Sequence, residues 1–215
     1  MKRNLAIVLI VFSAALTTVW AQRIGIETNE KHNVATAERR IKGSPVATME
    51  VSGVKISYPQ VQVDPIPGFT NVGGNIKTEL AHGDVRVGLA DILRHIGTFE
   101  TTKTMRVLDI NHKSQTIKPG KYDLGFEYQI KQKMWALQLS TTGGESVANV
   151  PLFVKEGSPV IESLSIMLTT MPGKTVEVKK DVEYRYEASG IRVNLRWGDL
   201  DCTTTDIGFA DDSAN

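Results

Sequence analysis

The sequence predicts an all-β domain, built as an antiparallel β-sandwich or an open barrel with one short helical insertion. Two observations lead to this fold class. Apolar and polar residues alternate with a period of two in several short runs, and Pro-Gly or Ser-Gly pairs separate these runs. A period of two places successive side chains on opposite faces of a strand. Many short strands separated by turn residues are typical of sandwiches and barrels.

The first 21 residues predict a secretory signal peptide. Lys2 and Arg3 precede an apolar run over residues 5–16, and Ala21 supplies the small residue at the cleavage position. This run is shorter than the roughly 20 apolar residues that a membrane-spanning helix needs. We therefore expect a periplasmic or secreted mature protein that begins at Gln22 and has no further membrane span.

The remainder has the size of one domain. We expect a flexible leader over residues 22–43, a β-rich domain over 44–207 and a disordered tail over 208–215. The chain carries 25 Lys and Arg against 24 Asp and Glu, and this near-neutral balance argues against a nucleic-acid binder, which needs a basic face. Cys202 is the single cysteine, so an intramolecular disulfide is excluded, and its sequence context predicts a half-buried strand residue.

Alternation is clearest over residues 122–130 and 135–139, and the short polar connection at residues 131–133 predicts a hairpin. Similar runs occur at 54–58, 164–168, 182–186 and 191–197. The predicted core is formed by Tyr122, Leu124, Phe126, Tyr128, Trp135, Leu137, Leu139, Leu164, Ile166, Leu168, Val193, Leu195 and Trp197. Sugar-binding sandwiches often expose Trp as a stacking platform, but both Trp residues fall on the apolar parity, which favours core positions.

Two segments interrupt the strand pattern. Val87–Ile96 has apolar residues at helical spacing and predicts the helical insertion. Val61–Lys77 contains two prolines and a Gly-Gly pair, which indicate a long loop. Long loops are often where function is located.

The candidate site surrounds Arg86, with Tyr58, Asp84 and the Val61–Lys77 loop. A guanidinium is always charged and binds carboxylate or phosphate bidentately, so Arg86 can serve as an anion-binding residue at the floor of a cleft. Tyr58 ends a strand and borders the long loop, so it can line that cleft. The alternative is a structural ion pair, in which Arg86 faces a buried carboxylate of Asp84, Asp91 or Glu100.

Catalytic and metal-binding motifs are absent from the sequence. There is no phosphate-binding glycine loop, nucleophile elbow or pair of cysteines at metal spacing. The four histidines, His32, His82, His95 and His112, show no helical or strand pairing. We predict scattered surface histidines, and neither a metal nor a cofactor.

Several segments resemble the family catalogued as domain of unknown function 2911. The opening segment is carried by Ser44, Pro45, Ala47, Val51, Gly53, Ile56, Tyr58 and Pro59, followed by Gly83, Arg86 and Gly88, and then by Thr98, Phe99 and Thr101. Residues 117–124 resemble the family's Pro-Ala-Gly-Thr-Tyr-Ser-Leu segment, Trp135 fits its following Trp, and 164–168 and 193–197 resemble its final strands. The resemblance spans about residues 44–207 and implies an exported bacterial β-rich domain without an assigned activity.

Two function hypotheses follow. The first is a non-catalytic domain that binds a ligand or an envelope protein. The alternative is a periplasmic hydrolase acting on a peptide or glycan, with Asp84 and Asp91 as acid and base, which requires the two carboxylates to converge.

Overall fold

A computed structural model describes residues 42–62, 93–179 and 183–210, and these residues form strands almost throughout. The strands are β1 Val46–Val51, β2 Val54–Pro59, β3 Gly97–Thr101, β4 Met105–Leu108, β5 Ser114–Ile117, β6 Gly120–Gln129, β7 Met134–Ser140, β8 Ser146–Val154, β9 Ile161–Thr170, β10 Lys174–Lys179, β11 Glu183–Glu187, β12 Gly190–Gly198, β13 Leu200–Thr204 and β14 Ile207–Phe209. The all-β prediction is confirmed.

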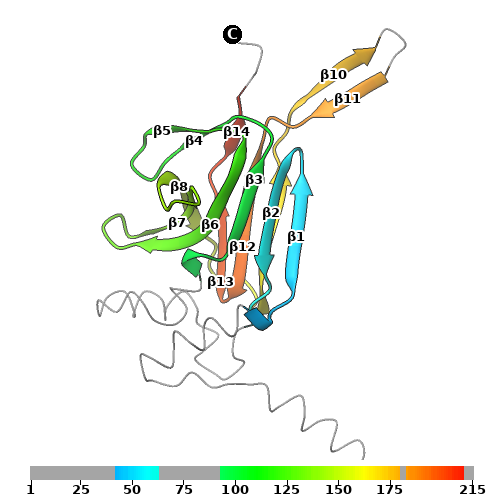
Figure 1. The fold of residues 1–215 in the computed structure, drawn as a ribbon. Helices are drawn as coiled ribbons and strands as arrows, with labels where there is room; N and C mark the ends of the chain where they lie inside the picture. The colour runs from blue at the N-terminus through cyan, green and yellow to red at the C-terminus, as the bar shows by residue number, and fades with distance from the viewer. Residues whose placement is uncertain (1–41, 63–92, 180–182, 211–215) are drawn as a thin grey trace, which may run out of the picture.

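Twelve of these strands form one antiparallel sheet in the order β1-β2-β3-β6-β7-β8-β13-β12-β14-β4-β5, with β9 added on the other side of β12 (Figure 1). β9 meets the chain that follows β2 through an isolated bridge between Gln62 and Ser163 and a hydrogen bond from Leu164 N–H to Val61 C=O of 2.8 Å. Beside this contact, Leu168 N–H donates to the sulfur of Met49. These contacts bring β9 close to β1 and β2, but among the described residues no continuous strand pairing joins them. The sheet is therefore open, as in a sandwich or an open barrel.

Local sequence explains the hairpins. The β1–β2 connection is Ser52-Gly53, and both residues have positive φ, 52° and 82°. This is the backbone conformation of a two-residue type I′ turn, whose twist matches the flanking strands. The predicted β6–β7 hairpin is confirmed, because Gln129 pairs with Met134 and the Lys131–Lys133 connection lies between them.

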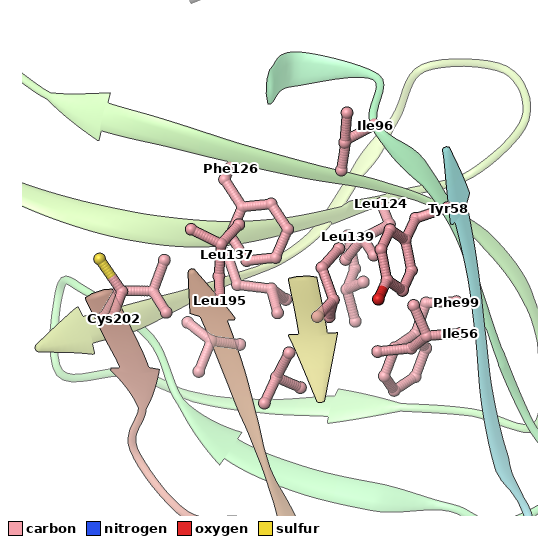
Figure 2. Packing of buried hydrophobic residues seen from close by; sticks show 14 of the residues in the cluster. Ile56, Tyr58, Ile96, Phe99, Leu124, Phe126, Leu137, Leu139, Leu195 and Cys202 are labelled. Atoms are coloured by element: carbon pink, nitrogen blue, oxygen red, sulfur yellow. The ribbon is translucent and has the colours of Figure 1, made fainter. Parts of the chain in front are cut away.

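The predicted core is confirmed as well. All thirteen predicted residues lie in one buried cluster or pack against it (Figure 2). The side chains of Trp135 and Trp197 are only 2% and 0% exposed, so both are core residues and neither is a stacking platform. Cys202 is more buried than expected, at 0% exposed. Ile130, which shares the apolar parity of β6, is exposed because it lies beyond the end of that strand.

Two segments differ from the sequence pattern, and a third is described only in part. β10 and β11 form a separate two-stranded sheet, which projects from the body (Figure 1). β14 runs to Phe209, two residues past the expected domain end. Of the Val87–Ile96 insertion, residues 93–96 are described, and of these Leu93 and Arg94 are helical. No helix within the described ranges has the length and apolarity needed to cross a bilayer.

Candidate functional site

The structure describes one of the three predicted site residues. Arg86, Asp84 and most of the Val61–Lys77 loop lie outside the described residues, so their clustering stays a prediction. Tyr58 is on the inner face of β2, where it is 5% exposed and belongs to the core cluster. Figure 2 shows its ring among buried residues that include Phe99 and Leu139. In this position Tyr58 contributes to the core.

The histidines are predicted to be scattered over the surface. His95 and His112 are both exposed, and His32 and His82 lie outside the described ranges. Across 42–62, 93–179 and 183–210, no three His, Cys, Asp or Glu side chains are grouped in a way that could hold a metal ion.

Two regions of the outer surface of the sheet differ, and the first, which we call the covered half, is the outer face of β6 and β7. Gly125 lies on this face, and a Cβ at this position would overlap the carbonyl oxygen of Arg94. The segment that precedes β3 therefore packs directly onto β6. Ala136, an outward residue of β7 that pairs with Glu127, is 0% exposed. Small outward residues thus lie where the outer face of the sheet is covered.

Glu127 is the centre of the polar network on the covered half. Its Oε1 accepts a charged hydrogen bond from Arg94 Nη2 at 2.7 Å, and both side chains are partly buried. Its Oε2 accepts from Gln129 Nε2 at 2.8 Å and Gln138 Nε2 at 2.6 Å. The carboxylate is thus engaged on both oxygens by neighbouring side chains, and these contacts hold the Arg94 segment against the sheet.

The second half, which we call the open half, is the outer face of β8, β13, β12 and β9. The strand registers place four residues in one row across these strands: Phe153, Thr203, Asn194 and Met167. Phe153 is 59% exposed and Met167 is 44% exposed. Two large apolar side chains therefore lie at the ends of the row, with two polar residues between them.

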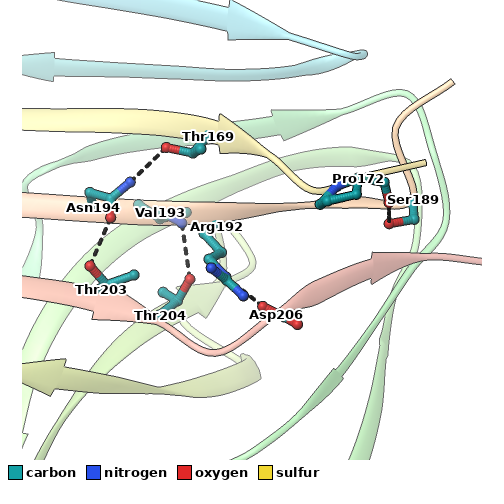
Figure 3. Close-up of polar contacts among 9 residues, drawn as sticks. All are labelled: Thr169, Pro172, Ser189, Arg192, Val193, Asn194, Thr203, Thr204 and Asp206. Carbon is teal, nitrogen blue, oxygen red and sulfur yellow. Dashed lines mark hydrogen bonds and ion pairs between the residues drawn. The ribbon is translucent and has the colours of Figure 1, made fainter. Parts of the chain in front are cut away.

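Hydrogen bonds fix the polar centre of the open half. Thr203 Oγ1 donates to Asn194 Oδ1 at 2.7 Å, and Asn194 Nδ2 donates to Thr169 Oγ1 at 2.9 Å. In Figure 3 the ladder runs from Thr203 on β13 through Asn194 on β12 to Thr169 on β9. Because both ends of the Asn194 amide are held, its orientation is set before any ligand arrives.

Two ion pairs flank the ladder. Arg192 Nε lies 2.5 Å from Asp206 Oδ1 (Figure 3), and this hydrogen bond and the charge of Asp206 raise the pKa of Arg192 above its usual range. On the other side Arg196 Nε lies 3.4 Å from Asp201 Oδ2, and Arg196 Nη2 donates to the carbonyl of Pro159 at 2.7 Å. Each guanidinium therefore has a carboxylate beside it.

A buried threonine holds the strands beneath the ladder. β12 pairs with β13 over one stretch and with β14 over another, and the change falls near Val193. There the N–H of Val193 donates to Thr204 Oγ1 at 2.9 Å, and Thr204 is 2% exposed. This side-chain bond replaces a ladder bond and satisfies a donor that would otherwise be buried alone.

The sequence pattern did not identify the open half. Phe153 falls in the unbroken apolar run Val150–Val154, in which alternation cannot distinguish an inward from an outward residue. The structure resolves this run: Val150 and Leu152 face the core, and Phe153 faces outward. The ladder joins β9, β12 and β13. The registers of these strands depend on pairing between residues far apart in the sequence, which a local pattern does not contain.

Fold and surface together define an all-β domain with an open antiparallel sheet and one exposed, partly apolar outer face. No protein-family model, curated protein or solved structure matches the chain. The resemblance to domain of unknown function 2911 stays a prediction.

Proposed function

We propose that the chain is an exported, non-catalytic binding domain of the bacterial cell envelope and that it binds through the open half. The observation that carries this proposal is the exposure of Phe153, 59%, beside a hydrogen-bonded polar ladder on the same face. Phe, Met and Arg are enriched at protein interfaces, and Phe153, Met167 and two arginines of β12 all lie on this face.

The predicted signal peptide supports the proposed location. A positively charged start, an apolar run and Ala21 direct the chain out of the cytoplasm. Sequencing the N-terminus of the exported protein checks this, with Gln22 as the expected first residue. The alternative hydrolase depends on Asp84 and Asp91, which lie outside the described residues, so it stays a prediction.

Cosedimentation with isolated bacterial envelopes tests the binding face. The wild-type protein should sediment with the envelopes, and Phe153→Asp should remain in the supernatant because a carboxylate replaces the exposed ring. Ile130→Asp is the matched control, since Ile130 is similarly exposed, at 55%, but lies at the β6–β7 turn. Equal sedimentation of the wild type and Phe153→Asp would contradict the proposal.

A further inference from the structure

We infer that the open half binds an uncharged polysaccharide, with Phe153 as its stacking residue and Asn194 as its main hydrogen-bonding residue. This inference rests on the proposed binding role of the open half and specifies the class of ligand. Three observations support the inference: the exposed ring of Phe153, the unused hydrogen-bonding capacity of the ladder, and the pairing of charges on the face.

Phe153 supplies the apolar part of such a site. Aromatic rings have a negative face, which attracts the positively polarised C–H groups on one side of a sugar ring. Trp135 and Trp197 are buried, and Phe153 is the aromatic residue among the large exposed hydrophobic side chains whose burial the structure describes. The stacking role considered for Trp135 and Trp197 therefore passes to Phe153.

The ladder supplies the polar part. A side-chain amide has two N–H donors and an oxygen with two lone pairs. Asn194 uses one N–H on Thr169 and accepts one hydrogen bond from Thr203. One donor and one acceptor therefore remain on a fixed amide. Neighbouring hydroxyl groups of a sugar each donate and accept, so they complement this pair, and the fixed amide loses little entropy on binding.

Charge pairing favours an uncharged polymer. The Arg192–Asp206 and Arg196–Asp201 pairs neutralise the charges on both sides of the ladder. Lys155, two residues after Phe153, is exposed and adds one positive charge at the border of the face. An anionic polymer would need unpaired cations, and these rows pair each arginine with an aspartate.

The spacing of the row favours a chain over a single sugar. Phe153 and Asn194 are two strands apart, about 10 Å, and Met167 lies one strand further, at about 14 Å. A sugar stacked on Phe153 would therefore leave the polar ladder to a later sugar of the same polymer. A polysaccharide that crosses the strands can use the whole row.

Affinity gel electrophoresis and titration calorimetry of the mature full chain test this inference. The probes are barley β-glucan, xylan, galactomannan and soluble starch. At least one polymer should retard the wild-type protein, and Phe153→Ala should weaken that binding about tenfold. Phe153→Trp should preserve it, and Asn194→Ala should weaken it about fivefold. Ile130→Ala is the control that should bind like the wild type.

Each outcome either supports or overturns the inference. Binding to none of the four polymers, or unchanged binding by Phe153→Ala, would overturn the inference. If Asn194→Ala fails to fold by circular dichroism, Thr169→Val replaces it, because it removes the hydroxyl from the exposed end of the ladder. If envelope binding requires Phe153 while all four polymers fail, the ligand class is wrong and the proposed binding face stands, with a protein as its partner.

Discussion

The covered and open halves belong to one sheet, yet they treat their outward residues differently. On the covered half the outward residues include Gly125 and Ala136, and the Arg94 segment packs onto β6. On the open half they include Phe153 and Met167, which are 59% and 44% exposed. On the covered half, small outward residues therefore lie where another segment packs onto β6, whereas on the open half two large apolar side chains stay exposed.

The polar networks of the two halves differ in the same way. Glu127 receives three side-chain N–H donors, from Arg94, Gln129 and Gln138. Asn194 makes two hydrogen bonds and keeps one donor and one acceptor. The first network holds the Arg94 segment against the sheet, and the second leaves hydrogen-bonding atoms of Asn194 without a partner within the ladder.

The largest expected effect is that of Gly125→Ala on the covered half. The new methyl group would overlap the backbone carbonyl of Arg94, which cannot move away as a flexible side chain could. We expect a loss of about 3 kcal/mol or more in the free energy of unfolding, measured by urea denaturation. Gly208→Ala is the matched control, because its Cβ would meet nothing closer than 3.9 Å. Equal, small losses in both variants would show that β6 is not tightly covered.

An intermediate effect is expected at the β4–β5 turn, which contacts β8 through the hydrogen bond from Ile110 N–H to Asn149 C=O. Burial raises the pKa of the Asp109 carboxyl, but hydrogen bonds from the N–H groups of Lys113 and Asn111 and from the Gln115 amide outweigh it and lower the pKa. The stabilisation is therefore present above the unfolded pKa, about 3.9, and is lost as the pH falls through the lower folded pKa.

Asp109→Asn tests this pH dependence. The variant should lose about 1–3 kcal/mol of stability at neutral pH, because an amide N–H₂ replaces an accepting oxygen that faces the Gln115 amide. The loss should shrink as the pH falls from the unfolded pKa of about 3.9 through the lower folded pKa, below which the wild-type carboxyl is protonated in the folded protein too. Urea denaturation of both proteins at neutral and acidic pH measures it, and a difference that stays constant with pH would refute the role of the charge.

Local alternation was sufficient to predict the fold class and the core. Residues such as Leu124, Phe126 and Trp135 follow the period of two on strands that bury one face, so their inward positions could be predicted. The projection of β10 and β11 from the body could not be predicted. Apolar and polar residues alternate in the same way whether a strand joins the main sheet or leaves it.

The candidate site was harder to predict for a related reason. Coverage of Gly125 depends on Arg94, thirty-one positions away, and the ladder depends on the registers of β9, β12 and β13. Neither relation appears in a local pattern. The predicted cluster of Arg86, Asp84 and Tyr58 stays a prediction except for Tyr58, whose ring is in the core.

The smallest expected effect on stability is that of Phe153→Ala on the open half, and it separates the two faces of the sheet most directly. Phe153 is 59% exposed, so removing its ring should change the free energy of unfolding by no more than about 0.5 kcal/mol. Phe126→Ala makes the same chemical change on the inner face, where the ring is 1% exposed, and should cost about 3–5 kcal/mol. Urea denaturation of the two variants gives the comparison. A loss above about 2 kcal/mol for Phe153→Ala would mean that its ring packs against the protein. The ring would then be unavailable to a ligand, and the open half would no longer qualify as a binding face.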